Sequence, residues 1–230
     1  MASHSAPGRL IRGGISLFLV PLLRHTLLNR RVTTKVLGVR LSIDPGVFHP
    51  SLYFSTTILA RYVRSLTLLN TTVLDMGTGS GALAIHAAAQ GASVTAVDIS
   101  STAVGCARRN IRDAGLDARV EVLESDLFTS IPPHLKYDYI FWNPPFYPRP
   151  PLNAAAAAWN AGEGYSVIRR FAGEALRHLA DHGKIVLIFS SDMRIPEIVY
   201  FFRECGLQTT IVESRWRMFE EYQIHEFSKE

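Results

Sequence analysis

The sequence contains few of the residues that cross-link small domains or bind metal ions. Its 230 residues include two cysteines, Cys106 and Cys205, and neither belongs to a C-x-x-C pair. A disulfide framework and a zinc site are therefore not expected, and a reducing compartment, the cytoplasm, is the predicted location. The eight histidines form no pair with an acidic companion at ligand spacing, so no metal ion is expected.

Acidic residues are absent from the first 43 positions. Seven basic residues precede Asp44, which leaves 17 basic and 20 acidic residues for the rest of the chain. The apolar stretch 15–28 is shorter than the about 20 residues that span a bilayer, and Pro21 and Arg24 interrupt it. Residues 1–43 are predicted to form a basic, apolar, helical arm. It could pack on the domain's own surface, contact RNA, an acidic partner or a membrane surface, or serve as a targeting segment.

Residues 44–230 are predicted to form one globular domain, since 47% of the chain is hydrophobic. From Thr72 onward, strand-like and helix-like segments alternate. Strands are expected at 72–76, 93–98, 119–123, 138–142, 183–190, 207–213 and 222–228, and helices at 81–90, 101–114, 165–180 and 195–205. This order predicts an α/β fold with a doubly wound, mostly parallel sheet and an antiparallel edge hairpin.

A glycine-rich turn joins the first of these strands to its helix. In VLDMGTGSGAL, Gly77, Gly79 and Gly81 allow the backbone to turn sharply and to approach a ligand at the positive end of a helix. Asp98 ends the next strand about 20 residues later, where a carboxylate can accept both ribose hydroxyls of an adenosine. The turn and Asp98 therefore predict a cofactor that contains adenosine.

The turn alone leaves two classes of cofactor open. The spacing Gly77-x-Gly79-x-x-Ala82 also satisfies the dinucleotide fingerprint, so an NAD(P)-dependent or flavin oxidoreductase is the rival hypothesis. Asp75 ends the strand just before the glycines, where its carboxylate could pair, directly or through water, with a ligand ammonium group. S-adenosylmethionine carries adenosine and an ammonium group but no phosphate. Asp75 and Asp98 therefore favour S-adenosylmethionine.

The segment FWNPPFYP follows the fourth strand. The Asn143 side-chain oxygen and the Pro144 carbonyl are two acceptors one residue apart, and the prolines hold both in place. Phe146 and Tyr147 offer a flat surface for a planar group. An amide or aromatic amine is a weak nucleophile because its lone pair is delocalised, so its NH2 group must be held and aimed at the methyl donor. The segment therefore predicts methylation of a planar nitrogen, with a turn that merely ends a strand as the alternative.

Together these motifs resemble the class I S-adenosylmethionine-dependent methyltransferases of the N-P-P-[FYW] group, which includes the release-factor glutamine methyltransferases, ribosomal-RNA guanine methyltransferases and DNA adenine-amino methyltransferases. The resemblance extends from about Pro45 to the C-terminus. It implies a seven-stranded Rossmann-like methyltransferase domain over 44–230 and S-adenosylmethionine as cofactor. The expected acceptor is a planar amide or amine nitrogen of a protein side chain or small molecule, and the alternative is an exocyclic base amine in RNA.

The resemblance also implies roles for individual residues. The residues expected to contact the cofactor are Asp75, Gly77, Thr78, Gly79, Ser80, Gly81, Asp98, Ile99, Asp126, Leu127 and Asn143. Those expected to bind the methyl acceptor are Asn143, Pro144, Pro145 and Phe146. In the segment PGVFHPSLYFST, Phe48, Phe54 and Thr56 are candidates for closing the cofactor pocket. The segment 148–164 is long for a connection and is expected to cover the substrate.

Overall fold

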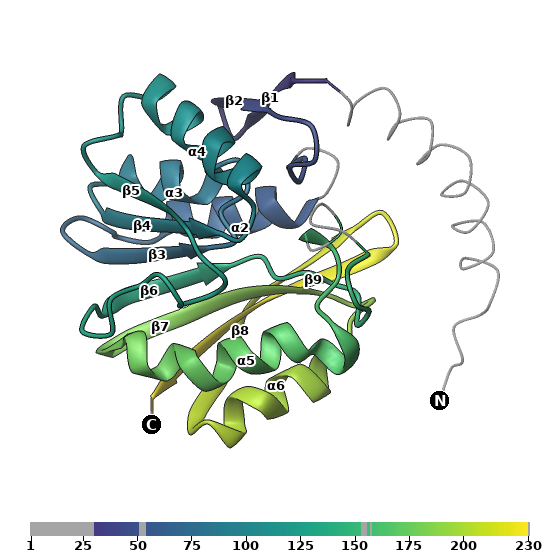
Figure 1. Ribbon diagram of the computed structural model, residues 1–230. Helices are drawn as coiled ribbons and strands as arrows, with labels where there is room; N and C mark the ends of the chain where they lie inside the picture. Colours follow the sequence, from purple (N-terminus) through teal and green to yellow (C-terminus); the bar gives the residue numbers. More distant parts are fainter. Residues whose placement is uncertain (1–29, 51–53, 153–155, 157, 230) are drawn as a thin grey trace.

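Seven strands form the central sheet, in the order β5-β4-β3-β6-β7-β9-β8 (Figure 1). The computed structural model describes residues 30–50, 54–152, 156 and 158–229. The strands are β3 (Thr72–Met76), β4 (Ser93–Asp98), β5 (Val120–Glu124), β6 (Tyr137–Trp142), β7 (Leu179–Ser190), β8 (Leu207–Arg217) and β9 (Glu220–Lys229). Strands β5, β4, β3, β6 and β7 run parallel, and β9 is antiparallel to both of its neighbours. The predicted α/β fold with an antiparallel edge hairpin is confirmed.

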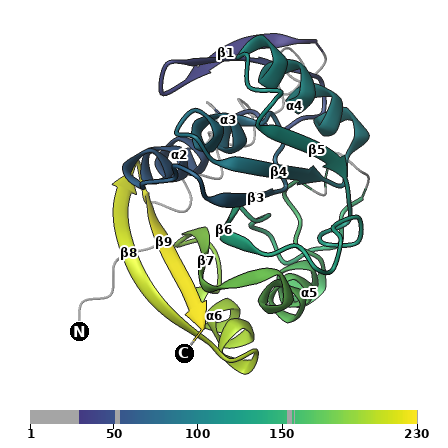
Figure 2. The same ribbon diagram turned by 90° about the vertical axis from the view of Figure 1, so that its left-hand side faces the viewer.

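Helices cover both faces of this sheet, as a doubly wound sheet requires. Figures 1 and 2 show α2, α3 and α4 on one face and α5 and α6 on the other. Their bounds are α2 (Phe54–Ser65), α3 (Ala82–Ala88), α4 (Ser101–Asp113), α5 (Ser166–Ala175) and α6 (Ile195–Glu204), with 3-10 turns at Glu163–Tyr165 and Leu176–His178. Successive β7 side chains alternate between the faces: Val186 joins the apolar core with α3, and Leu187 joins the core with α5.

A second, two-stranded sheet replaces part of the predicted helical arm. Strands β1 (Val32–Val36) and β2 (Val39–Ile43) pair antiparallel, so the prediction of a helical arm is wrong for these residues. They are rich in β-branched side chains, which favour strands. Leu37 and Gly38 have φ values of 46° and 92°, and such a two-residue turn matches the twist of a hairpin. The apolar stretch 15–28 lies outside the described residues.

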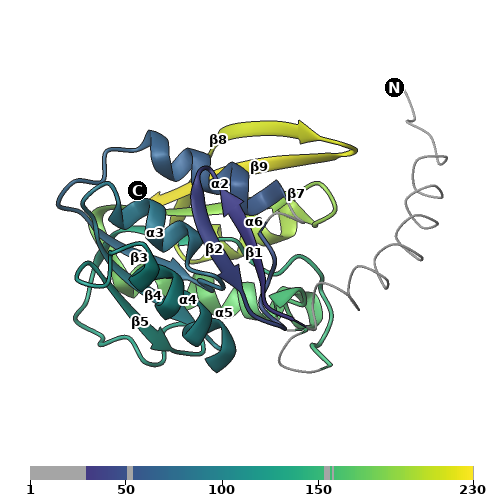
Figure 3. The ribbon, with the colours of Figure 1, turned by 90° about the horizontal axis from the view of Figure 1, so that it is seen from above.

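The β1–β2 hairpin is attached to the domain. It lies over α3 and α4 (Figures 1 and 3). The Asn110 side chain of α4 binds both backbone groups of Ser42, at 2.8 Å and 3.0 Å. The Asp44 carboxylate accepts hydrogen bonds from Arg31 and Arg109, each at 2.6 Å. Residues 30–43 therefore pack on the larger sheet's helical layer through specific contacts.

Two further elements differ from the sequence-based expectations. Helix α5 ends at Ala175, and from Leu179 onward the chain is already β7, because Leu179 pairs with Tyr137 of β6. The predicted helix 165–180 was therefore too long. Helix α2 was not predicted, although its buried residues Ile58, Leu59 and Val63 follow a helical period.

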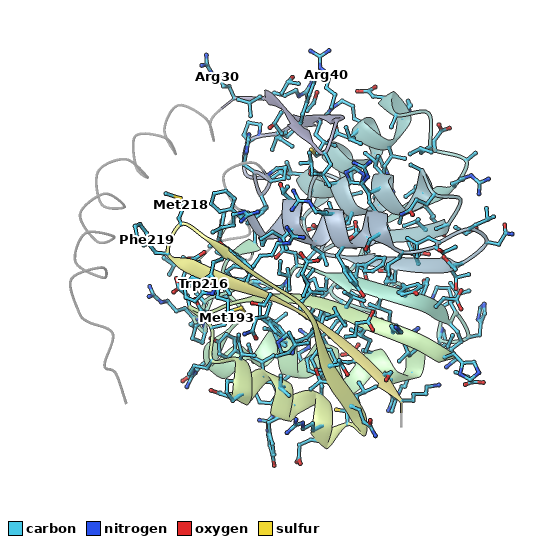
Figure 4. The ribbon with its side chains drawn as sticks, turned by 180° about the vertical axis from the view of Figure 1, so that it is seen from behind. Arg30, Arg40, Met193, Trp216, Met218 and Phe219 are labelled. Carbon is cyan, nitrogen blue, oxygen red and sulfur yellow. The ribbon has the colours of Figure 1, made fainter. Side chains whose placement is uncertain are left out.

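The β8–β9 hairpin extends past the carboxyl end of β7. Ser190, the last residue of β7, pairs with Tyr222, so the turn that precedes Tyr222 lies beyond this strand end. Trp216, Met218 and Phe219 at the tip are exposed (Figure 4). Among the described residues, no helix has the length and apolar character needed to cross a membrane.

Candidate active site

A cavity of about 270 Å³ opens at the carboxyl edge of the parallel strands. Its walls come from the turns that follow β3, β4, β5 and β6, together with the segment 46–50, helix α2 and the connection between β6 and α5. Strand β3 lies between β4 and β6, so the chain adds strands first on one side of β3 and later on the other. Ligands of doubly wound sheets bind beside the strand where this change of direction occurs. The cavity therefore occupies the place where the sequence predicted the cofactor.

The glycine turn forms the floor of the cavity through Gly77, Thr78, Gly79 and Ser80. Gly77 has a φ of 62°, and a Cβ added there would lie 3.2 Å from the indole Nε1 of Trp142. A side chain at this position would therefore be strained and would press on the cavity wall. Gly81 does not line the cavity; its missing Cβ would lie 3.4 Å from Ala107, so it permits close packing of α4.

Asp98 lies at the end of β4 and lines the cavity. Its carboxylate accepts hydrogen bonds from the backbone N–H groups of Gly79 and Ser100, both at 2.9 Å. Burial raises the pKa of Asp98, and these hydrogen bonds offset part of that effect. The next residue, Ile99, is 55% exposed and presents an apolar side chain to the same cavity. The Gly79 N–H, which would bind a phosphate in a dinucleotide site, thus already has a carboxylate partner.

Asp75 lies behind the cavity wall. It is 1% exposed and is not among the lining residues. Its Oδ2 accepts hydrogen bonds from Thr78 Oγ1 at 2.6 Å and from the Ala84 N–H at 3.1 Å, while Oδ1 is buried without a partner among the described residues. Burial raises the pKa of Asp75 to about 7. In this geometry the carboxylate holds Thr78 and the first turn of α3.

Two residues expected to contact the cofactor follow β5. Asp126 and Leu127 both line it, and Leu127 adopts a φ of 52°. The Asp126 carboxylate forms an ion pair with Arg170 of α5, with Nη2 3.0 Å from Oδ2. Arg170, another lining residue, was missed from the sequence because an arginine on a helix face carries no distinguishing signal. The negative charge of Asp126 is therefore paired with the positive charge of Arg170, 44 positions away in the sequence.

The segment after β6 brings the predicted acceptor-binding residues Asn143, Pro144, Pro145 and Phe146 to the cavity. The Asn143 amide nitrogen, Nδ2, donates to Ser55 Oγ at 3.1 Å and to Thr56 Oγ1 at 3.3 Å. Its Oδ1 is buried and has no partner among the described residues. An unpaired buried acceptor is costly, so this oxygen is a position where a donor from a ligand would be stabilised.

Two aromatic side chains meet at the cavity from distant segments. Phe48 and Trp159 both line it, and their ring centroids are 4.6 Å apart. The Tyr147 N–H donates to the Trp159 carbonyl at 2.9 Å, which fixes this end of the 148–164 connection. Thr56 also lines the cavity, whereas Phe54 is 40% exposed and does not. Trp159 thus brings this connection to the cavity, and its covering of the substrate stays a prediction.

Within the described ranges, no group of three or more histidine, cysteine, aspartate or glutamate residues could hold a metal ion. The sheet order, the acid at the end of β4 and the N-P-P-F segment on one cavity match the arrangement of the class I S-adenosylmethionine-dependent methyltransferases. Residues 38–215 match the family model described as Methyltransferase small domain. The chain belongs to that family, and the resemblance stated from the sequence is confirmed.

Two curated relatives are glutamine methyltransferases. The chain is 34% identical over 186 residues to the ribosomal protein uL3 glutamine methyltransferase of Burkholderia pseudomallei, covering 71% of this chain and 59% of that protein. It is 35% identical over 176 residues to the release factor glutamine methyltransferase of Streptococcus pneumoniae, covering 70% and 61%. The chain thus spans about three fifths of the length of these relatives.

A solved structure confirms the fold. The T. thermophilus 16S rRNA N2 G1207 methyltransferase, solved in complex with AdoMet and guanosine, superposes with a TM-score of 0.65 and 21% identity. The superposition covers 87% of this chain and 50% of that chain. At this identity the likeness shows the arrangement of strands and helices, which is the Rossmann-like methyltransferase arrangement that was predicted.

Proposed function

We propose that the protein transfers the methyl group of S-adenosylmethionine to the side-chain amide nitrogen of a glutamine in a protein. The observation that carries this proposal is the Asn143 side chain, which lines the cavity and whose Oδ1 atom is buried without a partner among the described residues. A primary amide offers the N–H donor that this oxygen lacks. The names of the two relatives, which describe glutamine methyltransferases, support the same acceptor.

The residues present fit this cofactor better than a dinucleotide. The Gly79 N–H is bound by the Asp98 carboxylate, so a pyrophosphate would meet negative charge at the glycine turn. S-adenosylmethionine would be held by Gly77, Thr78, Gly79 and Ser80 at its methionine part and by Asp98 at the ribose. Asp126 and Leu127 would flank the adenine, with Ile99 on the same cavity. When bound, it would supply an electrophilic methyl group. Asp75 would contribute by holding Thr78 rather than by direct contact.

The protein's own residues would orient the acceptor. Asn143 Oδ1 and the Pro144 carbonyl would accept the two amide hydrogens, which directs the nitrogen lone pair towards the cofactor side of the cavity. Phe146 would support the plane of the amide. The acceptor nitrogen would form a bond to the methyl carbon as the carbon–sulfur bond of the sulfonium breaks, which leaves a neutral thioether, and the nitrogen would release one proton to water. No strong base is needed, because holding the nitrogen in place provides the main acceleration.

Two assays test this proposal. Calorimetry compares S-adenosylmethionine with NAD(P), and we expect binding of the first alone; NAD(P) binding alone would move the protein to the oxidoreductases. Cell extract incubated with methyl-labelled cofactor is then separated into protein and RNA and analysed by mass spectrometry. Label on a glutamine supports the proposal. Label on RNA alone contradicts it and favours an exocyclic base amine as acceptor.

The remaining expectations concern the surroundings of the enzyme. We propose a cytoplasmic location, which is supported by the scarcity of cysteine. We also propose that the basic N-terminal residues contact an acidic partner or a membrane surface, supported by the absence of acidic residues before Asp44. Steep weakening of a contact with added salt would support a charged partner.

A further inference from the structure

We propose that Ser55 and Thr56 are positioning residues that orient the Asn143 amide, so that its oxygen alone faces the methyl acceptor. This inference rests on the proposed function. It adds two residues of α2, 87 and 88 positions away from Asn143 in the sequence, to the acceptor-binding site. It also explains how the site would distinguish an amide from a carboxylate.

The hydrogen bonds of Asn143 distinguish the nitrogen end of its amide from the oxygen end. A primary amide has two N–H donors and one oxygen acceptor. The two hydroxyl oxygens lie 3.1 Å and 3.3 Å from Nδ2, so both donors can be used within the protein. Oδ1 is then left as the free polar atom. In this orientation Oδ1 is therefore the amide atom left to bind the methyl acceptor.

Helix α2 holds the two hydroxyls in place. Ser55 is 0% exposed and Thr56 is 7% exposed, and both lie in the first turn of α2. Ile58 and Leu59, one turn further on, are buried in the core that α2 shares with α3. A helix anchored by its apolar face keeps its first turn in a fixed position relative to β6. The hydroxyls can therefore act before any substrate binds, as preorganised groups do.

Rotation of the Asn143 amide by half a turn would reverse its chemistry. The NH2 group would then face the cavity, and two donors would oppose the NH2 group of a glutamine. The same orientation would attract a glutamate carboxylate, which has only acceptor oxygens. With the oxygen facing the cavity, a glutamate would instead meet acceptor against acceptor. The observed orientation, in which Nδ2 contacts the two hydroxyls, therefore favours glutamine over glutamate.

Side-chain amide exchange tests the contact without requiring a methyl acceptor. In 15N-labelled protein, the Asn143 NH2 signals are assigned by their loss in Asn143→Asp. We expect their hydrogen exchange with water to be at least about tenfold faster in Ser55→Ala/Thr56→Val than in the wild type, because both hydrogen bonds are removed. Thr57→Val, one position along the same helix, is the matched control and should leave the exchange unchanged. Equal exchange in the double variant and the wild type would overturn the proposal.

Kinetics test the consequence with a short peptide that contains one glutamine. Thr56→Val preserves the shape of the side chain and should lower kcat by about tenfold, as loss of an orienting hydrogen bond does, while Thr56→Ser should recover most of that loss. Ser55 does not line the cavity, so Ser55→Ala should leave the KM for S-adenosylmethionine unchanged. In an Asn143→Ala background, removing the hydroxyls should have no further effect, because they act through Asn143.

The two experiments separate the possible failures. Equal further losses in the Asn143→Ala background would show that Ser55 and Thr56 act on the fold instead, and so would a lowered melting temperature with a normal kcat per folded molecule. If the wild type methylates no glutamine peptide, the proposed function fails at that point. The exchange measurement still decides the orientation of Asn143 in that case.

Discussion

Replacing Asp75 by asparagine should change how stability depends on pH. The substitution keeps the shape of the side chain, and an amide oxygen can still accept the hydrogen bonds from Thr78 and Ala84. Burial raises the pKa of Asp75 to about 7 in the folded protein, against about 3.9 for an unfolded aspartate. The folded state therefore binds a proton more tightly than the unfolded state does. Between these two pH values the wild type should lose stability as the pH rises, and Asp75→Asn should not lose this contribution.

The magnitude follows from the size of the pKa difference. A difference of about three units corresponds to about 4 kcal/mol, at about 1.4 kcal/mol per unit. The penalty is absent below about pH 4 and complete above about pH 7, so the difference in unfolding free energy between variant and wild type should shift by about 4 kcal/mol in favour of the variant across this window. The buried amide hydrogens of the variant add a cost of about 1–3 kcal/mol that does not depend on pH.

Urea unfolding of both proteins at several pH values between 4.5 and 8 measures this shift. Calorimetry on the same samples measures the affinity for S-adenosylmethionine, which should change little if the carboxylate only holds Thr78 and the first turn of α3. Parallel stability curves for the two proteins would refute the reasoning about burial. A large loss of cofactor affinity would show that Asp75 acts on the ligand ammonium group, directly or through water.

Four further substitutions test other parts of the site and the core. Asn143→Ala should lower turnover by about 100-fold or more with little change in cofactor affinity, whereas Asp98→Ala should weaken cofactor binding first; kinetics and calorimetry compare the two. Trp159→Ala removes the ring contact with Phe48 and should raise the Kd for S-adenosylmethionine by about three- to tenfold in calorimetry. Burial lowers the pKa of His225 to about 4 in the folded protein, against about 6.5 in the unfolded chain. The unfolded state therefore binds the proton more tightly, and about 3 kcal/mol of stability should be lost as the pH falls from about 6.5 to about 4. His225→Gln should remove that loss in urea unfolding.

The elements nearest to the glycine turn were predictable from the sequence. Strands β3 and β4 begin and end where the apolar segments 72–76 and 93–98 do, because glycine and aspartate mark their ends clearly. The β1–β2 hairpin does not follow from the charge and apolar content of the arm, because the signal for it is the β-branched character of residues 32–43. The end of α5 was missed because pairing of Leu179 with Tyr137 is a tertiary contact. Local patterns carry no information about such contacts.

The site shows the same limit at the level of single side chains. The sequence indicated Asp75 as an acid beside a ligand, but not that its carboxylate would be turned towards Thr78 and Ala84 behind the cavity wall. It indicated Asn143 through the N-P-P-F motif, but Ser55 carries no motif. That contact forms only because α2 and β6 meet in the folded domain. Residue types were predictable, whereas their partners depended on the fold.

The most direct measurement locates the transferred methyl group. A peptide containing one glutamine is incubated with the protein and methyl-labelled S-adenosylmethionine, and the product is fragmented in a mass spectrometer. We expect one labelled methyl group on the glutamine side-chain nitrogen with the wild type, and at least about 100-fold less with Asn143→Ala. Label on another atom of the peptide, or equal labelling by the wild type and Asn143→Ala, would contradict amide methylation directed by Asn143.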